Sequence, residues 1–84
     1  MVVTIVEKTD EFVRTIQKIK DGLIKERVAK QIEKIVSNPE IGKPMQFGRK
    51  GTREVYIPPF RLSYIYAKEE EKLIFLELYH KDKQ

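Results

Sequence analysis

The sequence contains no cysteine and no tryptophan, and it has a single histidine. The absence of cysteine excludes disulfides, catalysis by a thiolate and zinc sites built on thiolates. One histidine, without carboxylates clustered on a predicted element, gives no pattern of metal ligands, so we expect neither a metal nor another cofactor. No apolar run approaches the ~18–20 residues of a membrane-spanning helix, and the one at the N-terminus is too short for a signal peptide. We therefore expect a cytoplasmic protein that does not bind membranes.

The chain is short and basic. Its 84 residues correspond to one domain over residues 1–84, because domains typically run from about 50 to 250 residues. The formal net charge is +4. Much of this excess lies between residues 43 and 67, where Glu54 is accompanied by five basic residues: Lys43, Arg49, Lys50, Arg53 and Arg61. Such a local excess is typical of a surface that binds a polyanion, and a solvated basic face is the alternative.

Hydrophobic periodicity in the first half predicts a strand followed by two helices. The apolar residues between 2 and 6 are typical of a strand. Thr9, with the acids that follow it, can cap the first helix. Apolar residues then recur at helical spacing, with a break at Asp21-Gly22, until Pro39 ends the second helix. Two helices joined by so short a turn form an antiparallel hairpin.

The second half predicts a loop and three strands. Glycine and proline make residues 39–51 a loop. Strands are expected at residues 55–57, 60–67 and 73–79, joined by turns at Pro58-Pro59 and at 68–71. In the last strand, strict alternation places Ile74, Leu76 and Leu78 on one side and Phe75, Glu77 and Tyr79 on the other. The sum is an α+β fold of order β-α-α-β-β-β, in which the helical hairpin covers one face of an antiparallel sheet.

Short motifs in the second half occur in a fixed order. They are Asn38-Pro39, Gly42-Lys43-Pro44-Met45, Arg53-Glu54-Val55, Phe60-Arg61-Leu62-Ser63-Tyr64 and His80-Lys81. In this order and at these spacings they resemble the RelE/ParE toxin superfamily, and the likeness covers nearly the whole chain. The resemblance implies a RelE-like fold and a toxin held inactive by an antitoxin of the RelB type.

The resemblance also implies an activity, cleavage of mRNA on the ribosome. Such enzymes use the 2′-hydroxyl of the RNA to attack the adjacent phosphate, so the protein must position the phosphate, stabilise its added charge and move protons. No metal is needed where arginine and lysine supply the positive charge. The ribosome and mRNA, together with the antitoxin, are the partners that this reading implies.

Four residues are candidates for the chemistry. Arg61, in Phe60-Arg61-Leu62, matches the arginine of a strand that reads Tyr-Arg-Leu in the superfamily, and it can hold a phosphate through two parallel hydrogen bonds. A structural pairing with Glu54 or Glu77 is the alternative. Arg53 can direct a second cation toward the same phosphate or a neighbouring one, with a solvated arginine at the strand end as the alternative. Lys81 can stabilise the charge of the transition state. His80 is the natural general acid or base near neutral pH. We expect the two guanidinium groups to converge close to His80.

A second group of residues is expected to bind RNA. Lys43, Arg49 and Lys50 belong to the basic loop and can contact the RNA backbone, with solvated charge as the alternative. Tyr56 occupies a position where many members of the superfamily carry a further basic residue. It can stack on a base or pack against its neighbours.

Three functional hypotheses stay open at this point. The first is the ribosome-dependent endoribonuclease. The second is a ParE-like toxin that inhibits DNA gyrase through protein contacts, because one fold hosts several functions. The third is a catalytically degenerate RelE-fold module that binds RNA or a protein. This last hypothesis is suggested by Tyr56 and by the lack of an aromatic residue after Tyr79, where active relatives usually carry one.

Overall fold

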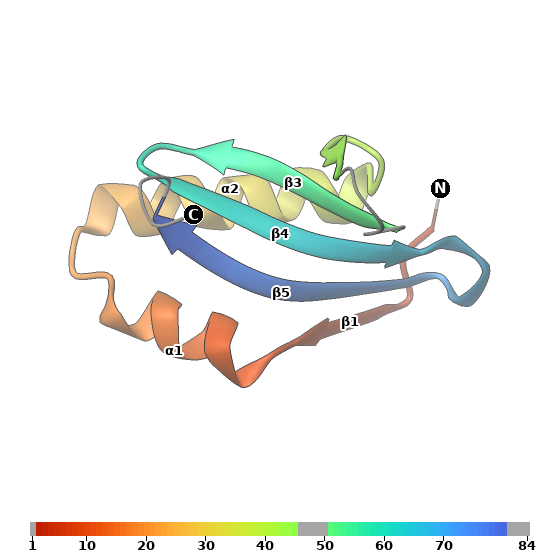
Figure 1. Cartoon of the computed structure of the whole chain (residues 1–84), viewed down its shortest axis with the longest axis horizontal. Coiled ribbons are helices and arrows are strands. Elements are labelled where there is room, and N and C mark those ends of the chain that lie inside the picture. Colours follow the sequence, from red (N-terminus) through yellow and green to blue (C-terminus); the bar gives the residue numbers. More distant parts are fainter. Residues whose placement is uncertain (1, 46–50, 81–84) are drawn as a thin grey trace.

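The computed structural model describes residues 2–45 and 51–80. The elements follow in the order β1 (Ile5–Lys8), α1 (Asp10–Lys18), α2 (Gly22–Ser37), β2 (Lys43–Pro44), β3 (Thr52–Ile57), β4 (Phe60–Ala67), a 3₁₀ turn (Lys68–Glu70) and β5 (Lys72–His80). The strands form one sheet in the order β1-β5-β4-β3-β2 (Figure 1). The predicted α+β fold, with two helices against a mostly antiparallel sheet, is confirmed.

Two features of the sheet differ from the prediction. The strand β1 pairs with β5 in parallel, whereas every other pair is antiparallel. A parallel neighbour is possible because the two helices carry the chain back across the sheet before β5 begins. In addition, the expected loop contains β2, whose Lys43 lies opposite Glu54 of β3.

Side-chain caps define where the helices begin. The Thr9 hydroxyl accepts a hydrogen bond from the Phe12 amide at 3.1 Å. The Asp21 carboxylate accepts one from the Leu23 amide at 2.9 Å. Asp21 was expected to mark a break, and it does so by capping the start of α2. In the described part of the chain, neither helix is both long and apolar enough to cross a membrane.

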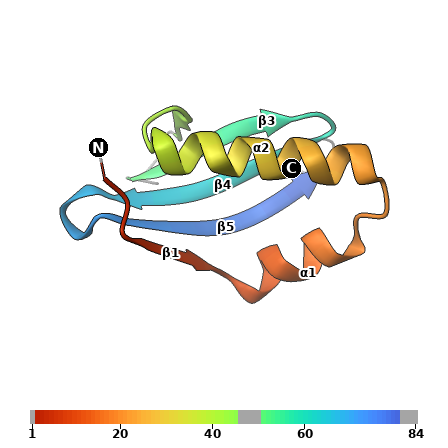
Figure 2. The same ribbon diagram turned by 180° about the vertical axis from the view of Figure 1, so that it is seen from behind.

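The sheet has two different faces. Figure 2 shows α2 lying across one of them, which we call the helix face. Its core includes Ile35 of α2 and the strand residues Leu62, Tyr64 and Phe75, all at most 1% exposed. Phe12 of α1 stacks on Phe75, with 5.5 Å between ring centroids. No helix among residues 2–45 and 51–80 lies over the other face, which we call the open face (Figure 1).

A β-bulge in β5 changes which side chains reach each face. Ser63 of β4 lies opposite Glu77, but the next residue, Tyr64, lies opposite Phe75, so Leu76 is the extra residue. The Thr9 hydroxyl donates to the Leu76 carbonyl at 2.6 Å. The strict alternation expected for β5 is therefore wrong. Its buried residues are Leu73, Phe75 and Leu78, because a bulge shifts the alternation by one position.

The segment between α2 and β2 is fixed to the helix face. The buried hydroxyl of Tyr64 donates to the Pro39 carbonyl at 2.8 Å and accepts from the Gly42 amide at 2.9 Å. Gly42 is required by this close approach, since a Cβ there would lie 2.7 Å from the Tyr64 hydroxyl oxygen. Tyr64 therefore joins the core to the chain that leads into β2.

Candidate functional site

Four side chains from three adjacent strands gather on the open face. They are Glu54 and Tyr56 of β3, Arg61 of β4 and Tyr79 of β5, and we call them the open-face cluster. Arg61 lies opposite Tyr56 on one side and opposite Tyr79 on the other. Directly opposed residues of an antiparallel pair share a face, so the sheet register alone brings these three together.

Glu54 is the centre of this cluster. One of its carboxylate oxygens, Oε1, accepts a hydrogen bond from Arg61 Nη1 at 2.7 Å. The other, Oε2, accepts one from the Tyr79 hydroxyl. The guanidinium carbon of Arg61 lies 5.9 Å from the centroid of the Tyr56 ring, within range of a cation–π interaction. A single carboxylate thus links three strands.

The cluster is partly shielded from water. The Glu54 side chain is 17% exposed and that of Arg61 is 33% exposed. Partial burial strengthens charge-assisted hydrogen bonds. Removing one partner would therefore cost more than it does for an ion pair on the surface.

Tyr79 should lose its proton at a higher pH than an ordinary tyrosine. Burial first, and then the hydrogen bond to Glu54, raise the pKa of Tyr79 to about 12. Because this folded-state pKa exceeds the unfolded value of ~10, the stabilisation is fully present below that value and is lost as the pH rises through the folded pKa. An ultraviolet titration of tyrosinate, with the Tyr79→Phe spectrum subtracted, measures this. A Tyr79 pKa of about 10, the value of an ordinary tyrosine, would contradict the burial of this hydroxyl against Glu54.

Arg53 and His80 lie on the helix face, away from the open-face cluster. Arg53 pairs with Tyr64 and donates from Nη1 to the carbonyls of Glu40 at 3.0 Å and Gly42 at 2.8 Å. His80 lies opposite Phe60, and the two rings meet edge to face at 5.8 Å. The expectation that both guanidinium groups converge beside His80 is therefore wrong. Neighbouring positions on a strand point to opposite faces, and the bulge in β5 gives the open face to Tyr79.

The residues expected to bind RNA divide into two sets. Lys43 is exposed, and its pairing with Glu54 places it on the open face, next to the cluster. Tyr56 is 50% exposed on the same face. Arg49 and Lys50 lie outside the described residues, as does Lys81, the fourth candidate for the chemistry. Lys43 and Tyr56 thus lie on the same face as Arg61.

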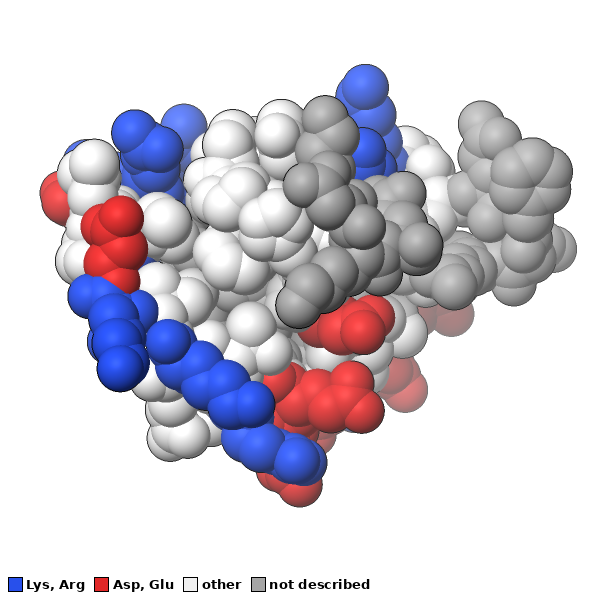
Figure 3. All heavy atoms as spheres, turned by 60° about the vertical axis from the view of Figure 1, so that its left-hand side comes forward, with Lys and Arg blue, Asp and Glu red and all other residues white. Residues whose placement is uncertain are grey.

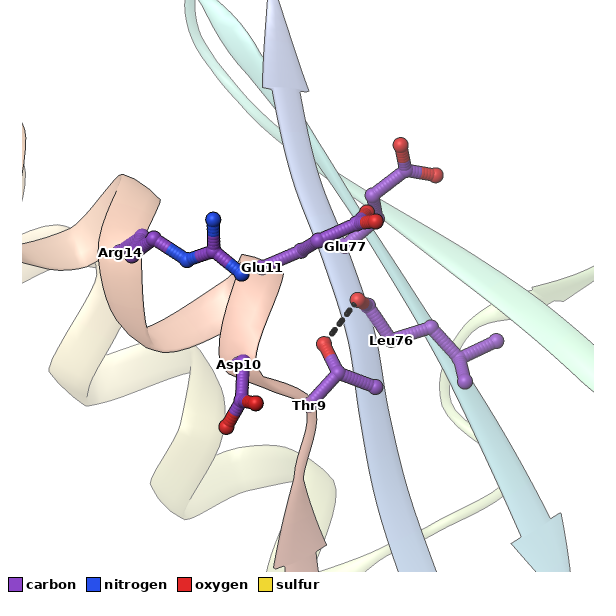
Figure 4. Close-up of a pocket in the computed structure, with 6 residues that line it drawn as sticks. All are labelled: Thr9, Asp10, Glu11, Arg14, Leu76 and Glu77. Carbon is purple, nitrogen blue, oxygen red and sulfur yellow. Dashed lines mark hydrogen bonds between the residues drawn. The ribbon is translucent and has the colours of Figure 1, made fainter.

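A shallow groove runs between α1 and β5, where β5 continues beyond the end of β1. One part, of about 480 Å³, is lined by Thr9, Asp10, Glu11, Arg14, Leu76 and Glu77 (Figure 4). A second part, of about 400 Å³, includes Lys18 and His80. Figure 3 shows basic and acidic side chains close together at this end of the molecule. This mixture makes the groove less suited to a polyanion than the open face.

The carboxylates are not arranged as metal ligands. Within residues 2–45 and 51–80, no group of three or more His, Asp or Glu side chains is placed to hold a metal ion. Glu54 instead uses both oxygens to bind protein donors. In this part of the chain, the chemistry available at the open face is that of hydrogen bonds, ion pairs and proton transfer.

Sequence reasoning did not select Glu54 or Tyr79 as site residues. Glu54 was considered as a possible partner of Arg61, and that pairing is present. The two-residue turn at Pro58-Pro59 sets the register that places Tyr56 opposite Arg61, so this part of the cluster could have been found. The position of Tyr79 depends on the bulge, for which the sequence of β5 gives no signal.

This fold is shared with solved toxin structures. The YoeB/ParE toxin from Agrobacterium tumefaciens superposes with a TM-score of 0.80 at 14% identity, covering 92% of this chain and 98% of that one. The archaeal RelE–RelB complex from Pyrococcus horikoshii OT3 gives 0.79 at 13% identity, covering 100% of both chains. The toxin–antitoxin complex RelBE2 from Mycobacterium tuberculosis gives 0.78 at 23% identity, covering 95% and 100%. The fold is therefore that of the RelE-like toxins.

Sequence comparison narrows this assignment to a family. Residues 6–84 match the family model described as the ParE toxin of the type II toxin–antitoxin system, parDE. The chain belongs to this family, which confirms the predicted membership of the RelE/ParE superfamily. Among individual curated proteins, none matches the sequence significantly.

Proposed function

We propose that this toxin cleaves mRNA on the ribosome and that Arg61 holds the phosphate at which the chain is cut. The observation that carries the proposal is the position of Arg61 on the open face, near the start of the central strand β4, between Tyr56 and Tyr79. Lys43 lies on the same face. An arginine, a lysine on the same face and an exposed aromatic ring are groups that can bind a single strand of RNA without a metal.

The contacts of Arg61 suit this role. Glu54 at 2.7 Å and the Tyr56 ring fix the direction of the guanidinium group. A fixed guanidinium loses less conformational freedom when it binds a phosphate, and it can stabilise the charge that the phosphate gains during attack by the 2′-hydroxyl. Tyr56, which is 50% exposed, is available to stack on a base next to that phosphate.

Replacing Arg61 by alanine should lower the rate of cleavage by roughly 10²–10³-fold, the usual loss when a group that stabilises transition-state charge is removed. Primer extension on ribosome-bound mRNA measures the cuts. Arg27→Ala, which removes an exposed arginine of α2, is the matched control and should cut like the wild type. If the wild-type protein makes no cuts, the ribonuclease proposal fails.

Gyrase inhibition is the second candidate. It is favoured by the match to the ParE family model and by Glu54, whose negative charge offsets that of Arg61 on the open face. A supercoiling assay with purified gyrase separates the two functions. Loss of supercoiling without any cleavage of ribosome-bound mRNA would support this second candidate instead.

An antitoxin of the RelB type is the partner that we propose for this chain. The structures from Pyrococcus horikoshii and Mycobacterium tuberculosis are described as complexes of toxin with antitoxin. By analogy, the antitoxin would hold this toxin inactive in the cytoplasm, where the ribosomes and mRNA are found. Co-expression with a small acidic protein encoded beside the toxin should relieve growth inhibition.

A further inference from the structure

We propose that Glu54 is the general base of the cleavage reaction, that Tyr79 is the proton donor to the leaving oxygen, and that the hydrogen bond between them restores both groups after each cut. This inference rests on the RNA cleavage proposed above. It assigns the proton transfers to two residues of the open face, since His80 lies on the helix face.

The contacts of Glu54 hold its carboxylate in one orientation. It accepts hydrogen bonds from Arg61 on one oxygen and from Tyr79 on the other. Each carboxylate oxygen has a second lone pair, so Glu54 can accept a further proton while Arg61 stays bound. The Tyr79 hydroxyl turns from Glu54 to the leaving oxygen as it gives up its proton, and the tyrosinate then turns back to Glu54. Being 17% exposed, it can be reached by a 2′-hydroxyl whose neighbouring phosphate is bound by Arg61.

The proposed step balances without any further reactant. The 2′-hydroxyl gives its proton to Glu54 as its oxygen forms a bond to phosphorus. The bond between phosphorus and the 5′-oxygen breaks, and that oxygen takes the phenolic proton of Tyr79. The resulting tyrosinate then takes the proton of the Glu54 carboxyl group through the hydrogen bond that joins them. The products are a 2′,3′-cyclic phosphate and a 5′-hydroxyl, and both residues return to their starting state.

The charges around the pair favour this direction of transfer. Arg61 of β4 favours negative charge on Tyr79, whereas Glu54 and, on the same face, Glu77 oppose it. Protonation of Glu54 in the first step removes its part of this opposition. Lys43 of β2 lies on the same face and can add positive charge for the phosphate. From α1, Arg14, Lys18 and Glu11 line the groove beside Tyr79. An alkoxide is more basic than a phenolate, so the 5′-oxygen can take the proton even from a tyrosine that ionises late.

A purely structural role predicts different behaviour. If Glu54, Arg61 and Tyr79 serve only to hold β3, β4 and β5 together, then substitutions should change the melting temperature and leave the rate per folded molecule unchanged. In the proposed role, each substitution removes one proton transfer, and the two transfers can be distinguished by the leaving group of the substrate.

The experiment uses ribosome-bound mRNA with either the natural 5′-oxygen or a bridging 5′-sulfur at the cut site, because a thiolate leaves without protonation. Glu54→Gln should slow cleavage of both substrates by roughly 10²–10⁴-fold. Tyr79→Phe should slow cleavage of the natural RNA by a similar factor and cut the sulfur substrate at close to the wild-type rate. The matched controls are Glu69→Gln in the exposed 3₁₀ turn and Tyr66→Phe on the helix face, both expected to be unchanged.

The outcomes separate this inference from the function on which it rests. If Glu54→Gln and Tyr79→Phe both cleave natural RNA at the wild-type rate, the inference is overturned, whereas the proposed ribonuclease activity is not. Absence of cutting by the wild-type protein would overturn both. The wild-type pH–rate profile needs no variant to fold. The rate should rise on the acid side as the base ionises, and a rate independent of pH there would also overturn the inference.

Discussion

Phe75→Ala should remove a large share of the protein's stability. Phe75 is 1% exposed and lies between the rings of Phe12 and Tyr64, at 5.5 and 6.1 Å. Truncating a buried phenylalanine costs ~3–5 kcal/mol, and a small domain has only ~5–15 kcal/mol in total. Since 1 kcal/mol corresponds to ~4–8 °C in a domain of this size, the melting temperature should fall by tens of degrees, as measured by circular dichroism.

The control for this truncation is Leu23→Ala. Leu23 is 58% exposed in the first turn of α2, so the same kind of substitution removes little buried surface, and surface changes usually stay within ~0.5 kcal/mol. Equal losses from the two substitutions would show that the stacking of α1 on β5 does not govern stability.

Gly42→Ala should produce the second large loss. The added Cβ would meet the Tyr64 hydroxyl at 2.7 Å and the Glu54 carbonyl at 3.1 Å. Neither can retreat easily, because Tyr64 is fully buried and the carbonyl belongs to the sheet. Overpacking costs ~1–3 kcal/mol, and displacing the Tyr64 hydroxyl would strand the Pro39 carbonyl and the Gly42 amide for a further ~1–3 kcal/mol each. Urea unfolding measures the change.

The same substitution at another glycine provides the comparison. A Cβ added to Gly22, the first residue of α2, meets nothing within 4 Å. Gly22→Ala should therefore leave stability unchanged or raise it by up to ~1 kcal/mol through the helix propensity of alanine. An unaffected Gly42→Ala protein would mean that Tyr64 does not hold the segment after α2 as closely as described.

Elements with continuous periodicity could be predicted from the sequence. The strand expected at residues 60–67 is β4 with the same bounds, and the second helix ends at Ser37, just before Pro39. By contrast, β2 has two residues and no period to detect. The parallel pairing of β1 with β5 depends on a partner far along the chain, and the sequence of residues 2–6 contains no information about its direction.

The candidate site could also be predicted only where it depends on local sequence. Arg61 and Tyr56 follow from the register of a two-residue turn. Arg53 was placed with them because its charge is visible in the sequence, whereas its bonding to the carbonyls of Glu40 and Gly42 is not. The open face carries Tyr79 where His80 was expected, because of the bulge at Leu76. The Thr9 hydroxyl, from a distant part of the chain, holds that bulge, so the sequence of β5 alone could not predict it.

The pairing of β1 with β5 has a consequence during synthesis. Thr9 reaches Leu76 across 67 positions of the chain, and Ile5 lies beside Lys72. Translation proceeds at ~5–20 residues per second, with the N-terminus emerging first. The strand β1 therefore stays without its partner until β5 has left the exit tunnel of the ribosome. The open-face cluster likewise cannot form until β5, which carries Tyr79, has been synthesised.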